Sequence, residues 1–311
     1  MEINNSYVFL TIGKTQESTE TQEFKKYVGV GSSFVVAVNP TKKQLEEIYG
    51  HELANDPEYV VDTDNGKEAR VSFVVKTDPN ICNGIEIINR AMFTLRNAPA
   101  YNKDESKVQV IDKYGNTTWA DTNDAKAGKK LFSATGKELK IDSSYRMACV
   151  GEADLVGFLK AYLGVGDAFN YVNDSWVKKD NADDFLFGLE HIKDYFSGDF
   201  SEVKDAIALQ PNNKVKLLYG VRTTEEGKQY QTVATRNGMV LLNSAGSKAL
   251  DRLEKELANA KNNGFYASTD FRVQPLAEYS VEPTDFSTAP AVPTGDQGSE
   301  TSMGNVMPWN Y

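Results

Sequence analysis

The chain has 311 residues, of which 40% are hydrophobic, so it can form one large domain or two small ones with real cores. Its net charge of -10 excludes a uniformly basic nucleic-acid-binding protein. No stretch reaches the roughly 18 consecutive apolar residues of a membrane span, and the start has no charged region or cleavage site of a signal peptide. We therefore expect a cytoplasmic protein with no membrane partner.

The charge is unevenly distributed along the chain. Between Asp64 and Arg146 there are 14 Lys and Arg against 11 Asp and Glu, a balance of +3, whereas the other residues hold 20 against 33. The basic excess coincides with strands that are rich in aromatic residues. An acidic total is therefore compatible with a local cationic groove.

The first strong strand is predicted at residues 27–38, and the glycines near its start indicate a bulge or bend of the kind that small barrels need. Thr41 and Gln44 then have the spacing of a capping box, which predicts a short helix that ends at Gly50.

Three β-segments follow this helix. Residues 68–78 alternate, with Val71, Phe73 and Val75 on one face, and residues 85–97 favour the next strand. Residues 107–120 are typical of a tight hairpin. Together with the first strand they predict an array of about five strands before residue 120.

Beyond residue 150 the pattern becomes mainly helical. Apolar spacing predicts helices at 151–165, 183–197, 201–209 and 247–264, with a β-hairpin at 214–235. This hairpin either completes the preceding sheet or belongs to a separate helical lobe.

Residues 281–311 have a different composition. They contain four prolines, four acidic residues and no Lys or Arg, and they have too few apolar residues to form a core. We expect a disordered acidic tail. Its last residues form a bulky hydrophobic tip that suits a protein partner; they include Pro308, Trp309 and Tyr311.

Catalytic and metal-binding motifs are absent from the sequence. There is no GxSxG, HExxH, GxGxxG or EF-hand pattern, and the two cysteines and two histidines are too scattered for a zinc site. We expect a binding protein that is not an enzyme and that needs neither a cofactor nor a metal.

Residues 91–119 interleave basic and aromatic side chains over strand-like runs. Such a surface suits single-stranded nucleic acid, because cations follow the phosphates and rings stack on the bases. The alternative is an ordinary sheet whose rings form the core and whose lysines are solvated.

Three stretches carry a resemblance to a known family: KKYVGVGSSFVVAVNPTKKQLEEIYG, IDKYGNTTWA and SYRMACVGEADLVGFLKAYL. They resemble the single-stranded DNA-binding proteins of tailed bacteriophages, in the version found in crAss-like phages of Bacteroidetes. The resemblance implies an α+β fold, an OB-fold-like small β-barrel elaborated with helices, plus the disordered tail. We expect an OB-like nucleic-acid-binding core at 1–150, a helical lobe with a β-hairpin packed on or completing the barrel at 151–280, and the tail at 281–311.

The resemblance also implies the function and its residues. The chain is expected to protect single-stranded DNA, with little sequence preference, during phage DNA replication, recombination and repair in the cytoplasm of the infected bacterial host. Its tail is expected to recruit replication proteins such as a polymerase, helicase or primase. The stacking candidates are Phe93, Tyr101, Tyr114 and Trp119, and the phosphate-binding candidates are Arg70, Lys76, Arg90, Arg96, Lys107, Lys113 and Arg146. The alternative is a virion structural or assembly protein that acts only through protein contacts.

Overall fold

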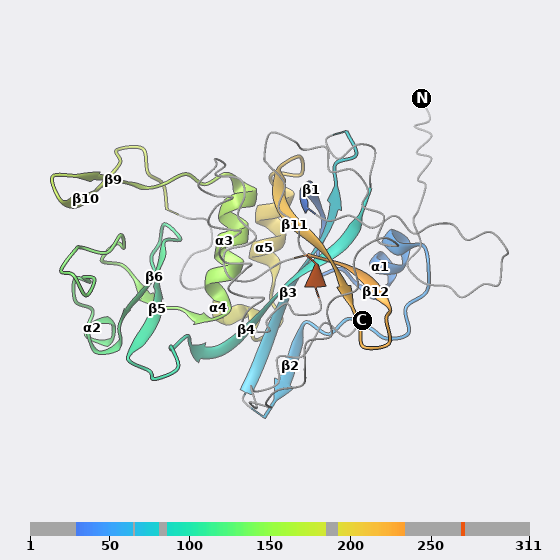
Figure 1. Cartoon of the computed structure of the whole chain (residues 1–311), viewed down its shortest axis with the longest axis horizontal. Coiled ribbons are helices and arrows are strands. Elements are labelled where there is room, and N and C mark those ends of the chain that lie inside the picture. Colours follow the sequence, from blue (N-terminus) through green and yellow to red (C-terminus); the bar gives the residue numbers. More distant parts are fainter. Residues whose placement is uncertain (1–28, 65, 81–85, 185–191, 234–268, 271–311) are drawn as a thin grey trace.

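The computed structural model describes residues 29–64, 66–80, 86–184, 192–233 and 269–270 (Figure 1). The helices are α1 Lys42–Tyr49, α2 Thr122–Lys126, α3 Glu152–Leu163, α4 Ile192–Tyr195 and α5 Ser201–Ala208. The strands are β1 Gly29–Val38, β2 Val60–Thr63, β3 Gly66–Thr77, β4 Ile88–Pro99, β5 Lys107–Ile111, β6 Thr117–Asp121, β7 Arg146–Met147, β8 Cys149–Val150, β9 Phe169–Val172, β10 Ser175–Lys178, β11 Lys214–Thr223, β12 Gln229–Val233 and β13 Thr269–Asp270. The class is α+β, as predicted, whereas the predicted helix at 247–264 and the tail at 281–311 lie outside the described residues.

The main sheet has eight strands in the order β12-β11-β1-β3-β4-β8, with β2 beside β3 and β13 beside β11. All its pairings are antiparallel. The hairpin β11–β12 joins β1 directly, so the sheet contains strands from both sides of residue 150. β12 and β4 point the same way, and their Cα atoms approach within 8 Å. Since no hydrogen-bonded ladder joins these two strands in the described part of the chain, the sheet curls without closing.

One face of the sheet forms the main core. The predicted alternation of β3 is confirmed, because Val71, Phe73 and Val75 are fully buried on this face. The Phe73 ring lies 5.8 Å from Phe93 of β4 and 4.4 Å from Phe158 of α3, measured between centroids. The predicted helix at 151–165 therefore packs on the inner face of the sheet as α3.

Two local predictions near the start of the sheet have different outcomes. The capping box of α1 is confirmed: Thr41 Oγ1 accepts from the Gln44 N–H, and Gln44 Oε1 accepts from the Thr41 N–H. Gly31 allows the buried Tyr219 ring to pack closely against β1 and does not form a bend. A Cβ at this position would lie 2.8 Å from that ring. The irregularity of β1 lies later, between Val35 and Ala37.

The prediction that β5 and β6 extend the array of β1, β3 and β4 is wrong. They form a separate three-stranded sheet, β6-β5-β7, with its own small core around Val108 and Val110. Pro99 ends β4 after a register shift, and a proline cannot continue a ladder as a donor. We call residues 100–147 and 166–184, which include this sheet and the hairpin β9–β10, the lobe; it lies beyond α3 at the left of Figure 1.

Candidate nucleic-acid interface

Four of the predicted phosphate-binding cations lie on one face of the main sheet. Arg70 and Lys76 belong to β3, and Arg90 and Arg96 belong to β4. Their sequence neighbours fill the core, so alternation directs these four side chains to the opposite, outer face. We call these four residues the cationic face.

Two carboxylates accompany the cationic face. Glu68 accepts from Arg96 Nε at 2.8 Å and lies 3.9 Å from Arg70 Nη2, while Glu86 lies 2.9 Å from Lys76 Nζ. Glu68 is buried, with 11% of its side chain exposed, whereas the Arg96 side chain is 48% exposed, so a phosphate can reach Arg96 beside this carboxylate.

The centre of the cationic face is closed to solvent. Ser72 and Val74 are fully buried there, and the half-buried Arg90 donates from Nε to Ser72 Oγ at 3.1 Å. Arg96, by contrast, is 48% exposed at the end of the face. A ligand therefore reaches this surface most readily at the Arg96 end.

β11 adds two lysines that the sequence analysis did not select. Lys216 is opposite Ser32 of β1, and Lys214 lies over the Phe34 ring at 5.0 Å. Lys214 also pairs with the buried Asp78, and its hydrogen bond lowers the pKa of that carboxyl. The alternation in KVKLL was a usable signal for these lysines once β11 was known to border β1.

Two of the four stacking candidates are core residues. Phe93 is 3% exposed and packs against Phe158 at 5.2 Å, and Tyr114 is 2% exposed and meets Phe169 edge-on at 5.4 Å. A base cannot stack on rings that are enclosed in this way. The structure thus corrects the prediction for both residues, whose large side chains are needed to fill two separate cores.

The other two stacking candidates are accessible. Trp119 is 43% exposed on β6 and shares a face of the β5–β6 ladder with the exposed Lys107. Tyr101 is half-buried, and Lys126 Nζ lies 5.6 Å from its ring centroid. These residues lie in the lobe, so the structure does not gather them with the cationic face on one sheet.

Lys113 and Arg146 are engaged within the fold. Lys113 lies 3.4 Å from Asp184 and over the Tyr114 ring. Arg146 donates from Nη1 at 2.8 Å to Glu152, which is 2% exposed at the start of α3. The Arg146 pair ties β7 to α3, so the prediction that Arg146 binds phosphate is replaced by this structural contact.

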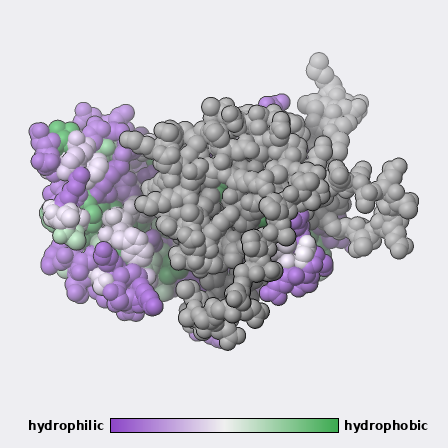
Figure 2. Space-filling model, in the orientation of Figure 1, coloured by the Kyte–Doolittle hydropathy of each residue, from purple (hydrophilic) through white to green (hydrophobic). Residues whose placement is uncertain are grey.

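The hairpin β9–β10 presents an aromatic pair that the sequence analysis missed. The Tyr171 and Trp176 centroids are 4.8 Å apart, and Lys137 Nζ lies 4.4 Å from the Tyr171 ring. Asn173 and Asp174 both have positive φ, as a two-residue turn of this hand requires, and an Asn-Asp pair between aromatic residues could have predicted it. The lobe surface around these rings is mostly hydrophilic with a few hydrophobic patches (Figure 2).

Pro308, Trp309 and Tyr311 lie outside the described residues. Within the residues that the structure describes, no three His, Cys, Asp or Glu side chains gather as a metal site requires. None of the described helices is both long enough and apolar enough to cross a membrane.

Comparison of the chain with protein-family models, curated proteins and solved structures finds no match.

Proposed function

We propose that the chain binds single-stranded DNA with little sequence preference, through phosphates at the cationic face and bases stacked on exposed rings. The observation that carries this proposal is the placement of Arg70, Lys76, Arg90 and Arg96 on one outer sheet face. A row of cations on neighbouring strands suits a polyanion, because each cation that neutralises a phosphate releases counterions condensed on the nucleic acid.

The strand order supports an OB fold as part of the same proposal. β1, β3 and β4 follow one another, β11 returns beside β1, and β12 runs near β4 in the same direction. α3 lies in sequence between β4 and β11 and packs on the inner face. OB folds bind oligonucleotides on the face of their second and third strands, which here are β3 and β4.

Exposed rings favour a single strand over a duplex. Trp119 and Tyr171 are each about two-fifths exposed, at 43% and 39%, and have cations nearby. Stacking on an aromatic side chain contributes about 1–3 kcal/mol per base, and it requires bases that are not already paired. The biological role that we propose is protection of DNA during phage replication, recombination and repair, with the acidic tail recruiting replication proteins.

The test is fluorescence anisotropy of a labelled 30-nucleotide oligo-dT, titrated at several salt concentrations, with duplex DNA as comparison. We expect the single strand to bind more tightly than the duplex and affinity to fall steeply with salt. Replacing Arg70 and Arg96 by Gln should reduce the slope of log affinity against log salt by about 0.7 for each phosphate that the variant no longer binds. The matched control is the double variant Lys193→Gln and Lys204→Gln. These exposed lysines belong to α4 and α5 and not to the strands that carry the cationic face. Absence of oligo-dT binding at low salt, both in the full chain and after removal of residues 281–311, would refute the proposal.

A further inference from the structure

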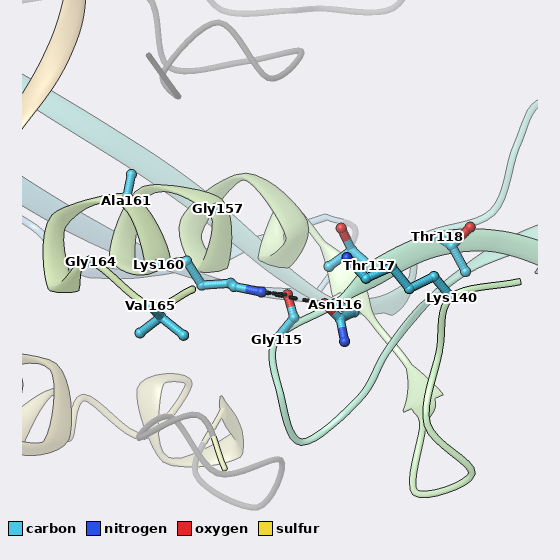
Figure 3. A pocket seen from close by; sticks show the side chains of 10 residues that line it. All are labelled: Gly115, Asn116, Thr117, Thr118, Lys140, Gly157, Lys160, Ala161, Gly164 and Val165. Atoms are coloured by element: carbon cyan, nitrogen blue, oxygen red, sulfur yellow. Dashed lines mark hydrogen bonds between the residues drawn. The ribbon is translucent and has the colours of Figure 1, made fainter. Parts of the chain in front are cut away.

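A cleft of about 520 Å³ separates α3 from the β5–β6 turn (Figure 3). Its walls are formed by the turn and the start of β6, by the C-terminal half of α3, and by Lys140. The lining residues are Gly115, Asn116, Thr117, Thr118, Lys140, Gly157, Lys160, Ala161, Gly164 and Val165. This volume lies within the range of small-molecule sites, roughly 300–1,000 Å³.

Lys160 enters this cleft from α3 and forms no ion pair within 4.0 Å with a described carboxylate. Its Nζ lies 3.4 Å from the Gly115 carbonyl oxygen and 3.5 Å from Asn116 Oδ1, as Figure 3 shows. Both acceptors are neutral, and no carboxylate of the described chain lies within 4.0 Å of this ammonium group. Burial lowers the pKa of Lys160, and it outweighs the charges of Asp112 and Asp167, which raise this pKa from a greater distance.

Asp112, the buried carboxylate of the turn, is already fully engaged. Its Oδ1 accepts from the N–H groups of Tyr114 and Asn116, both at 2.9 Å. Its Oδ2 accepts from Asn116 Nδ2 at 2.9 Å and from the Asp142 N–H at 2.8 Å. Four donors compensate this charge and fix the turn, so Asp112 acts on Lys160 through its charge at a distance and not as an ion-pair partner.

The remaining walls indicate the kind of ligand. Lys140 provides a second cation at the rim, where it pairs with the half-exposed Asp167. Thr117 and Thr118 carry hydroxyl groups, whereas the residues with which α3 lines the cleft include the small Gly157 and Ala161. None of the described residues that line the cleft is aromatic, so they offer no ring on which a base could stack. Two cations and hydroxyl groups without an aromatic wall suit a phosphate joined to a sugar.

We propose that this cleft binds the phosphate of a sugar phosphate, with Lys160 as its principal ligand and Lys140 as the second. The ligand is either a unit of a nucleic-acid backbone or a free sugar phosphate, since both carry the same group. The cleft is formed by α3 and the lobe, so this proposal does not depend on DNA binding at the cationic face.

The test is a two-dimensional amide NMR titration of the full, deuterated chain at constant ionic strength. The probes are ribose 5-phosphate, ribose, and an abasic deoxyribose-phosphate hexamer. We expect the amides of Asn116, Thr117, Gly157 and Gly164 to shift saturably with ribose 5-phosphate and not with ribose. If the hexamer binds with higher affinity than ribose 5-phosphate, the site is for a nucleic-acid backbone. If ribose 5-phosphate binds with higher affinity, the site is for a small metabolite.

Variants make the assignment specific. Lys160→Gln should weaken phosphate binding by about tenfold or more, because it removes a charged hydrogen-bond donor. Lys160→Arg should retain binding, and Lys204→Gln, the same charge change on the exposed side of α5, should leave it unchanged. If Lys160→Gln perturbs amides throughout the spectrum, Lys140→Gln takes its place, with weaker binding again expected.

Shifts that do not saturate, or full affinity in both lysine-to-glutamine variants, would overturn the proposal. The oligo-dT measurement is independent of this one. Binding of ribose 5-phosphate without binding of oligo-dT would support the phosphate site in the cleft and refute the proposed DNA binding. Binding of oligo-dT without binding of ribose 5-phosphate would support DNA binding and refute the phosphate site.

Discussion

The close approach of α3 to β4 predicts a large effect of replacing Gly151 by Ala. Gly151 precedes α3 with φ +83°, and a Cβ built there would lie 2.1 Å from the Thr94 carbonyl oxygen and 3.1 Å from its carbon. Carbon and carbonyl oxygen make close contacts at about 3.3–3.6 Å, so helix and strand must separate by about 1 Å. The whole of α3, including Lys160, would move with its first residue.

The loss of folding free energy expected for Gly151→Ala has two contributions. A side chain at this positive φ costs about 1–2 kcal/mol, and forcing extra volume into a packed contact costs about 1–3 kcal/mol more. A comparison with Gly164→Ala, at the other end of α3, distinguishes the two contributions. Gly164 has φ +67° but no atom within 4 Å of a Cβ, so Gly164→Ala should show only the first contribution.

Urea denaturation followed by intrinsic fluorescence measures both variants against the wild type. We expect Gly151→Ala to lower the free energy of unfolding by about 1–3 kcal/mol more than Gly164→Ala. If the two variants agree to within about 0.5 kcal/mol, α3 does not meet β4 as described, and the wall of the cleft is misplaced.

Three other predictions concern single carboxylates and one thiol. Glu68→Gln removes the anion shared by Arg96 and Arg70, so both guanidinium groups become available to phosphate. Oligo-dT affinity at low salt should rise by about two- to fivefold, and unchanged affinity in anisotropy titrations would contradict this. The Lys214 hydrogen bond depresses the pKa of Asp78, so this carboxyl stabilises the fold above the ordinary value of 3.8 and loses that contribution as pH falls through its folded pKa. Thermal unfolding between pH 5 and pH 3 should therefore be less pH-dependent in Asp78→Asn than in the wild type, although the variant is less stable at pH 7 by about 1.5–3 kcal/mol. Burial, and next the Glu152 charge, raise the pKa of Cys149 to about 11, so in a Cys82→Ser background its alkylation by iodoacetamide at pH 7.5 should be about 100-fold slower than in the unfolded chain. Equal rates in the folded and unfolded chains would show that the thiol is not buried.

Local chemistry decided which parts of the fold could be predicted. The capping box at Thr41 and the alternation of Val71, Phe73 and Val75 depend on residues a few positions apart, and both are confirmed. The sheet that β5 joins depends on the path of the chain after Pro99. The local pattern of residues 107–120 does not predict that path.

The same distinction explains the candidate site. The four cations of the cationic face could be placed by strand alternation alone, given that β3 and β4 are neighbours. The burial of Phe93 was not predictable in this way, because Phe158, which covers it, lies on a helix far along the chain. Phe93 and Trp119 both occupy strands with alternating patterns, and only the position of α3 makes one a core residue and leaves the other exposed.

The two groups of cations differ in what now balances them, and this difference predicts how each would respond to salt. Arg96 is paired with Glu68 of its own sheet and Lys76 with Glu86, which precedes β4, so an incoming phosphate meets cations that already have anionic partners. The hydrogen-bond acceptors of Lys160 are both neutral, so an anion in the cleft gains a half-buried cation without displacing an ion-pair partner. A strand that binds several cations of the sheet releases several counterions, so its affinity falls steeply with salt, whereas a single small anion in a half-buried cleft is screened less. Binding at the sheet should therefore fade as salt rises, while binding in the cleft persists, and a single titration series with both oligo-dT and ribose 5-phosphate can separate the two.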